Sequence, residues 1–175
     1  RNDLLDLDWA FERQIMELPF NGEMRRAVVT GGKAAIFEAM DAVTGEYLFS
    51  IDLDMQNVFS EIDPRTGDKT MFPEAVLKPG EDTPGLAKNG VCPDALGARN
   101  MQTTSYNPAT GMLYVPLQDT CINNLTGRRW QKYPNPEEDG KWGMVKAVNL
   151  ETREVEWTTR QYAPPASGHL TTDAG

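Results

Sequence analysis

Acidic side chains gather at the beginning of the chain. Between Arg1 and Arg13, carboxylates are interspersed with leucine, tryptophan and phenylalanine, at Asp3, Asp6, Asp8 and Glu12. Carboxylates brought together in this way can bind a hard cation through oxygen or take a proton from a substrate. The alternative is an amphipathic surface segment, because residues 7–11 nearly alternate between apolar and polar, although a helical turn fits them too.

A lysine directly follows two glycines, in Gly31-Gly32-Lys33, and is flanked by small and apolar residues. The residues around it, from Arg25 to Phe37, predict a strand, a turn at the two glycines and a second strand. A lysine at such a turn is commonly a solvated charge. One that points inward could instead serve as a fixed cation for an anionic ligand.

The chain contains two cysteines, Cys92 and Cys121, and one histidine, His169. The cysteines bracket a hairpin predicted from Thr103 to Pro116, with its turn at residues 107–111. They could form a disulfide, which would contribute about 3 kcal/mol and imply an oxidising compartment, or remain two buried thiols in a reducing one. With one histidine, this chain cannot build a multi-histidine zinc site or a histidine-centred triad.

Two segments share one longer pattern, from Ala39 to Phe49 and from Ala147 to Trp157. Both read Ala, any residue, Asp or Asn, two residues, Thr, Gly or Arg, Glu, two residues and a large aromatic residue. The Asp or Asn can accept hydrogen bonds in a β-turn, Gly45 supplies a positive-φ position, and the flanks alternate apolar with polar, so we expect two hairpins. The final aromatic residue would pack against a neighbouring copy, because one such unit cannot bury itself.

Two weaker echoes, from Asp63 to Asp68 and from Asn107 to Met112, repeat only the turn residues. Residues 50–90 are otherwise rich in proline, glycine and charge, and predict a long connection with little pattern.

The composition is that of a folded globular protein, because 39% of its 175 residues are hydrophobic and 25% are charged. This length allows one domain, and no apolar run is long enough to span a membrane. The formal charge of −9, with no basic cluster, argues against nucleic acid as a partner. Strand-like patterns are cut at both ends, so we expect a piece of a longer protein.

The repeat resembles the tryptophan-docking motif of the quinoprotein alcohol dehydrogenases, such as the methanol and ethanol dehydrogenases that use pyrroloquinoline quinone (PQQ). The segment from Gly97 to Pro116 resembles the asparagine-containing strand and hairpin of that family even more closely. The resemblance runs through nearly the whole chain. It implies an all-β fold, about two blades of an eight-bladed β-propeller, with residues 1–175 forming one partial domain that is truncated at both ends.

The same resemblance implies roles for single residues. Asp6 matches the catalytic aspartate of the family, although Leu5 stands where the family usually has tryptophan. Lys33 matches the Lys or Arg that contacts the quinone oxygens. Asn100 matches an asparagine that contacts the cofactor.

A second aspartate, Asp8, resembles an additional metal ligand of the lanthanide-dependent branch of the family. The calcium-dependent branch generally has an uncharged residue there. An extra carboxylate balances a higher charge and fills a larger oxygen shell, and in an extended strand Asp6 and Asp8 would face the same side. We therefore expect a lanthanide ion bound by Asp6 and Asp8, with Ca²⁺ as the alternative.

The resemblance implies that the intact protein oxidises a primary alcohol to the aldehyde with PQQ. A metal would act as Lewis acid, Asp6 as base, and Lys33 as the cation that stabilises the reduced quinone. Electrons would leave to a c-type cytochrome, and a homodimer is an open alternative for the assembly. Cys92 and Cys121 match a pair that forms a disulfide in methanol dehydrogenases, which fits the periplasmic location that the family implies.

Two alternatives stay open. A non-catalytic β-propeller binding module would share the blade repeat, but would leave to coincidence the joint presence of Asp6, Asp8, Lys33, Asn100 and the spaced cysteines. A family member acting on another alcohol or on a polymer would keep the chemistry, because residues outside this chain largely set the substrate pocket.

Overall fold

A computed structural model describes residues 5–9, 12–81, 85, 90–123, 131–134 and 139–172. Asp3 and Phe11 lie outside these residues. Among these residues every regular element is a β-strand except one short 3-10 helix, η1 (Pro73–Ala75). The strands are β1 (Gln14–Phe20), β2 (Glu23–Gly31), β3 (Ile36–Asp41), β4 (Tyr47–Asp52), β5 (Phe59–Ile62), β6 (Lys69–Met71), β7 (Ser105–Asn107), β8 (Met112–Gln118), β9 (Thr120–Asn123), β10 (Gln131–Pro134), β11 (Gly143–Asn149) and β12 (Glu154–Gln161).

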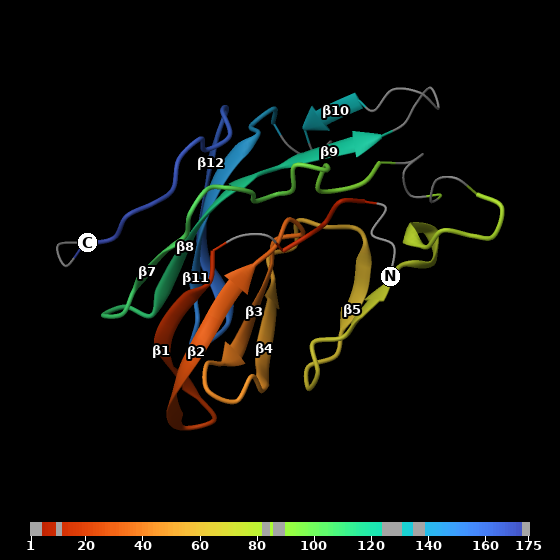
Figure 1. Cartoon of the computed structure of the whole chain (residues 1–175). Coiled ribbons are helices and arrows are strands. Elements are labelled where there is room, and N and C mark those ends of the chain that lie inside the picture. Colours follow the sequence, from red (N-terminus) through yellow and green to blue (C-terminus); the bar gives the residue numbers. More distant parts are fainter. Residues whose placement is uncertain are drawn as a thin grey trace.

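Two four-stranded antiparallel sheets form the framework (Figure 1). The first has the order β1-β2-β3-β4, and the second has the order β12-β11-β8-β7. There are two further antiparallel pairs of strands among the described residues. In chain order β5-β6 follows β4, and β9-β10 falls between β8 and β11. A meander of four antiparallel strands is the form of a propeller blade.

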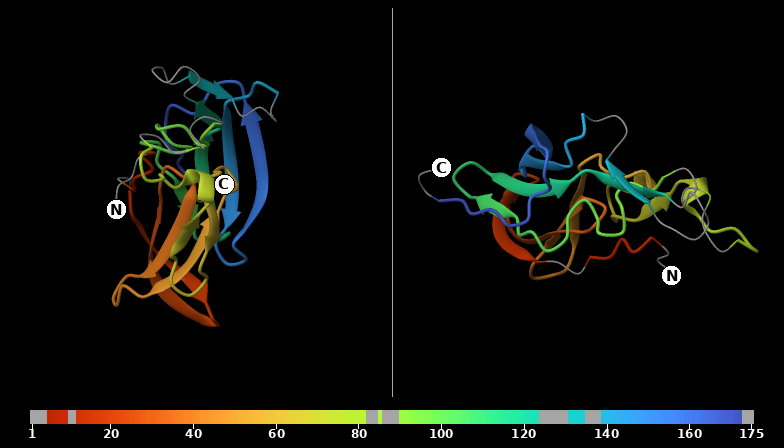
Figure 2. Two further views of the ribbon diagram at one scale, coloured as in Figure 1. Left: turned by 90° about the vertical axis from the view of Figure 1, so that its right-hand side faces the viewer. Right: turned by 90° about the horizontal axis from the view of Figure 1, so that it is seen from above.

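Apolar side chains from both sheets pack into one core. The two sheets lie against each other (Figure 2). Leu18, Phe37 and Phe49 come from the first sheet, and Leu113 and Val148 come from the second. All of them are nearly inaccessible to solvent. The last strand, β12, differs, because its side chains are largely exposed along its length.

The two long repeats fold into hairpins with the same register. Ala39 pairs with Phe49 across β3 and β4, and the pairing then shifts by one residue. Ala147 pairs with Trp157 across β11 and β12, and the pairing shifts at the same point. The predicted hairpins are confirmed, down to a shared bulge that the pattern alone did not specify.

Four turns share one geometry, including both echoes. In each, the residue four positions after the Asp or Asn has a positive φ and donates its N–H to that residue's carbonyl at 2.8–2.9 Å. The Asp or Asn Oδ1 also accepts the N–H two residues further on. The four pairs are Asp41 and Gly45, Asp63 and Gly67, Asn107 and Gly111, and Asn149 and Arg153. The prediction of a long connection for residues 50–90 is therefore wrong in part, because the turn at Asp63 closes the β5-β6 hairpin.

Candidate functional site

Lys33 lies in the turn between β2 and β3, at one end of the first sheet. The turn begins after Gly31, which is still part of β2, so it lies slightly later than predicted. Gly32 closes it, donating its N–H to the Ile36 carbonyl at 3.3 Å. Lys33 is only 8% exposed, which makes the alternative of a solvated hairpin charge wrong.

The ammonium group of Lys33 connects the two aspartates. Its Nζ lies 2.9 Å from Asp6 Oδ2 and 2.7 Å from Asp8 Oδ1. Burial lowers the pKa of Lys33, but the hydrogen bonds with Asp8 and Asp6 outweigh it, so the pKa lies above its usual value. Lys33 is therefore a fixed cation.

The aspartates converge although their segment is not extended. Residues 5–9 form neither strand nor helix, and Asp6 has a φ of 58°, in the left-handed region that residues other than glycine seldom adopt. The expectation of an extended strand is wrong. The left-handed backbone conformation at Asp6 accompanies the convergence of the two side chains instead. The side chains of Asp6 and Asp8 are 67% and 44% exposed, so both carboxylates remain accessible to a ligand.

A tryptophan holds the acidic segment against the turn. The Trp9 ring occupies the space beside Gly32, where an added Cβ would lie 2.8 Å from the ring. The ammonium group of Lys69 lies over the Trp9 ring, with its Nζ 5.2 Å from the ring centroid. Sequence reasoning did not select Trp9, because an aromatic residue in an amphipathic segment carries no signal of its partner.

Gly97 and Ala98, in the loop before β7, also lie against Lys33. Ala98 donates its N–H to the Lys33 carbonyl at 2.8 Å. The predicted cofactor contact, Asn100, donates its Nδ2 to the Leu96 carbonyl at 2.9 Å, within its own loop. The structure thus brings the segment that carries Asn100 to Lys33, while the Asn100 side chain bonds to its own loop.

Arg99 is a second residue that sequence reasoning missed. It is 1% exposed, its Nη1 donates to the Gly31 carbonyl at 2.6 Å, and its guanidinium forms an ion pair with Glu12. Burial lowers the pKa of Arg99, and the Glu12 carboxylate opposes that shift. The sequence offered one indication of a role for Arg99, its place beside Asn100. An arginine in a sequence is normally expected to be solvated, so this indication was not used.

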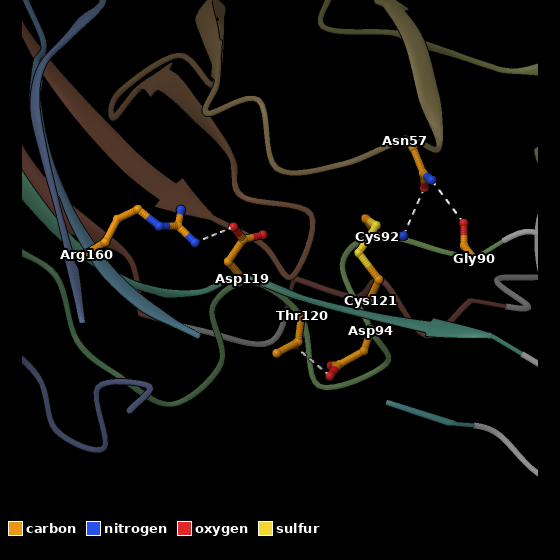
Figure 3. Close-up of a disulfide and its surroundings, with 8 residues drawn as sticks. All are labelled: Asn57, Gly90, Cys92, Asp94, Asp119, Thr120, Cys121 and Arg160. Atoms are coloured by element: carbon orange, nitrogen blue, oxygen red, sulfur yellow. Dashed lines mark hydrogen bonds and ion pairs between the residues drawn. A yellow bond between two sulfur atoms is a disulfide. The ribbon is translucent and has the colours of Figure 1, made fainter. Parts of the chain in front are cut away.

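A disulfide joins Cys92 to Cys121 on β9 (Figure 3). Asn57 accepts the Cys92 N–H at 2.9 Å. Thr120 donates its hydroxyl to Asp94 Oδ2 at 2.8 Å, on the other side of the bridge. These contacts fix the beginning of the segment that runs on to Ala98 and Arg99.

The residues present offer a hard cation a partial ligand set. Asp6 and Asp8 supply carboxylate oxygens, the donors that such cations prefer, and a Ca²⁺-like ion takes about six to eight of them. In the described ranges no group of three or more His, Cys, Asp or Glu side chains could hold a metal ion. The two aspartates fit such an ion, and its other ligands would have to come from outside these ranges.

The described ranges contain no helix long and apolar enough to cross a membrane.

Comparison with known proteins finds relatives among quinone-dependent dehydrogenases. No protein-family model matches the chain. It is 33% identical over 114 residues to the dehydrogenase subunit of alcohol dehydrogenase (quinone) of Gluconacetobacter polyoxogenes, covering 63% of this chain and 15% of that protein. It is 26% identical over 187 residues to the lanthanide-dependent methanol dehydrogenase of Methylorubrum extorquens, covering 98% of this chain and 31% of that protein.

Solved structures share the fold. A europium-containing methanol dehydrogenase matches 95% of this chain with a TM-score of 0.80 and 23% identity, over 30% of its own length. A quinohemoprotein alcohol dehydrogenase from Comamonas testosteroni matches 94% with a TM-score of 0.70 and 19% identity. The predicted resemblance to quinoprotein alcohol dehydrogenases and the predicted all-β, partial β-propeller fold are confirmed. The chain spans less than a third of the length of these relatives.

Proposed function

We propose that the intact protein oxidises a primary alcohol to the aldehyde, using PQQ and a metal ion, and that residues 1–175 form part of its propeller domain. The observation that carries this proposal is the convergence of Asp6 and Asp8 on the buried ammonium group of Lys33. It brings together a proton acceptor, oxygen donors for a hard cation and a fixed positive charge. Similarity to proteins named as quinone-dependent and lanthanide-dependent dehydrogenases supports it.

Asp6 is the proposed general base. Its carboxylate is held at 2.9 Å by Lys33, and the side chain is 67% exposed. A hydroxyl group that approaches within hydrogen-bond distance can transfer its proton to this oxygen. Lys33 keeps the carboxylate in one position, so the proton acceptor is oriented before the alcohol binds.

The other residues hold the groups that carry the redox chemistry. When bound, PQQ supplies a hydride acceptor and the metal ion supplies a Lewis acid. Lys33 would bind the quinone oxygens as a preorganised cation, and Asn100 would contribute an amide contact. Asp6 and Asp8 would bind the metal, and their two negative charges favour a lanthanide over Ca²⁺.

We further propose a c-type cytochrome as electron acceptor and a periplasmic location. The disulfide between Cys92 and Cys121 supports an oxidising compartment. The formal charge of −9 suits a basic protein partner.

The test of the base is Asp6→Asn in the intact protein. We expect kcat for a primary alcohol to fall by roughly a hundredfold or more. The control is Asp68→Asn, because Asp68 lies exposed in the turn between β5 and β6. Alcohol oxidation that is unchanged in Asp6→Asn would overturn the assignment.

Elemental analysis and an absorption spectrum of the same purified sample test the bound groups. About one lanthanide ion per chain together with PQQ is the expected result. Calcium with PQQ would preserve the activity and overturn the lanthanide assignment of Asp8. If neither a metal nor a quinone is found, and neither binds on addition, the non-catalytic binding module replaces the dehydrogenase.

A further inference from the structure

Arg99 is the largest of the fully buried side chains in the described part of the chain. A charged group is removed from water only at a high cost, so its site must compensate the charge and satisfy its donors. The contacts of Arg99 therefore indicate which part of the chain this buried charge positions.

Three contacts surround the guanidinium group. Nη1 donates to the carbonyl of Gly31, the last residue of β2, at 2.6 Å. Nη2 pairs with the Glu12 carboxylate, just before β1. The Cζ of Arg99 lies over the Phe37 ring on β3, 5.7 Å from the ring centroid. Arg99 thus contacts the chain before and after the turn that carries Lys33.

Glu12 is itself held in place by Thr104, just before β7, and by Thr30 on β2. Its Oε1 accepts the backbone N–H and the hydroxyl of Thr104, each at 2.8 Å. The Thr30 hydroxyl on β2 donates to the Glu12 carbonyl at 3.0 Å. The carboxylate that pairs with Arg99 is therefore held in one position.

Arg99 is connected to the Lys33 turn in two ways, through its side chain and through the backbone beside it. Gly31, whose carbonyl Arg99 binds, lies two residues before Lys33. Ala98, the residue before Arg99, donates its N–H to the Lys33 carbonyl at 2.8 Å. The side chain of Arg99 and the backbone beside it thus hold the Lys33 turn at two points.

We propose that Arg99 is a positioning residue, which fixes Lys33 between Asp6 and Asp8 and so determines the affinity of the protein for its quinone cofactor. This inference rests on the proposed function, because it takes Lys33 as the cofactor-binding cation. The residue type matters. The planar guanidinium presents its donors to Glu12 and Gly31 in a fixed geometry, whereas an ammonium group is a point charge on a flexible stem.

Arg99→Lys in the intact apoprotein, reconstituted with metal, is the test, and PQQ is the probe. Because residues that orient a binding group typically contribute 10- to 100-fold, we expect PQQ affinity to fall about tenfold. In a Lys33→Met background the same substitution should cause no further loss, because the two residues act as one unit. The matched control is Arg25→Lys, an arginine that pairs with Asp41 at the opposite end of β2, and it should leave PQQ affinity unchanged.

Hydrogen exchange provides a readout that needs no cofactor. The Lys33 N–H, which donates to the Asp8 carbonyl, should exchange faster in Arg99→Lys and at the wild-type rate in Arg25→Lys. Glu12→Gln, which removes only the charge of the partner, should act in the same direction if Arg99→Lys does not fold.

Additive losses of PQQ affinity, or a Lys33 amide that exchanges at the wild-type rate in both Arg99→Lys and Glu12→Gln, would overturn the positioning role. A wild-type protein that binds no PQQ would instead overturn the proposed function and the cofactor role that rests on it. Failure of the positioning role is thus seen in the variants, whereas failure of the proposed function is seen in the wild-type protein.

Discussion

The guanidinium of Arg153 lies over the ring of Phe49, 4.8 Å from its centroid, and so joins the turn of the second repeat to the aromatic residue of the first. Phe20 contributes a second ring at 5.5 Å. Phe49 is 4% exposed, whereas Trp157, at the same position of the second repeat, is 45% exposed. The final aromatic residue of the first repeat is therefore covered by the turn of the next one.

Arg153 makes this contact from a strained backbone. Its φ is 66°, a value that glycine adopts in the other three turns. Arg153→Ala removes the cation–π contact and keeps the strain, so we expect it to lower the free energy of unfolding by about 1–2 kcal/mol. Arg153→Gly removes both, and should be about 1 kcal/mol more stable than Arg153→Ala. Urea denaturation of the intact protein measures both values.

The control is the same pair of substitutions in a Phe49→Leu background. There Arg153→Ala should cost less, because the ring that the guanidinium covers is gone. An equal cost in both backgrounds would show that the contact with Phe49 does not stabilise the fold.

Asp41 makes stability depend on pH in the acid range. The N–H of Thr44, the guanidinium of Arg25 and the N–H of Val43 hold the pKa of Asp41 well below its usual range. Because the unfolded state then binds more protons, the contribution of Asp41 is complete above the unfolded pKa of about 4 and is lost as the pH falls further. Asp41→Asn should therefore flatten the acid side of the stability profile.

Asparagine is a suitable replacement because Asn149 fills the same place in the second repeat, where its Oδ1 accepts the N–H groups of Glu151 and Thr152. The turn is thus preserved while the charge opposite Arg25 is removed. Urea unfolding at intervals from about pH 6 to pH 2 measures the effect. A variant whose stability falls with acid as steeply as that of the wild type would contradict the prediction.

The turns could be predicted from the sequence because their chemistry is local. An Asp or Asn and a positive-φ residue within one turn determine the geometry, so Asp41 and Asn149 identified their hairpins without knowledge of the rest of the fold. The burial of Lys33 and Arg99 could not be predicted in this way. Arg99 binds the carbonyl of Gly31, 68 residues earlier, and no local pattern encodes such a partner.

The convergence of Asp6 and Asp8 shows a different limit. Their spacing predicts that the two side chains face one side of an extended strand. The structure instead brings them together through the left-handed backbone conformation of Asp6. A single strained φ is set by packing around it, and the sequence of the segment carries no sign of it. The roles of these residues as base and metal ligands come from a family resemblance and stay predictions.

The disulfide between Cys92 and Cys121 closes a loop of 29 residues. In the chain-entropy model, this closure stabilises the folded state by roughly 3–4 kcal/mol. We expect the double variant Cys92→Ser with Cys121→Ser to lose about that amount, and a reducing agent to destabilise only the wild type. Alkylation of the unreduced, unfolded protein followed by mass measurement provides a direct check, and two alkylated cysteines would contradict the bridge.

Gly97 lies in the loop that carries Arg99, directly against the side chain of Lys33. A Cβ on Gly97 would lie 2.5 Å from the Lys33 Cβ and 2.7 Å from the Arg99 carbonyl oxygen. Its φ is 83°, so a side chain would also be strained. Gly22 allows the two effects to be separated, because its φ is 84° and no atom lies within 4 Å of an added Cβ.

Gly22→Ala should therefore lower the free energy of unfolding by the backbone strain alone, about 1 kcal/mol. Gly97→Ala carries the same strain and must also displace Lys33 or the backbone of Arg99, which adds about 1–3 kcal/mol. Urea denaturation of the two variants measures the difference. If Lys33 binds the quinone, Gly97→Ala should also weaken PQQ binding, whereas Gly22→Ala should not. Equal losses of stability in the two variants would mean that the loop can move away from Lys33 at little cost, and the close approach would then not hold Lys33 in place.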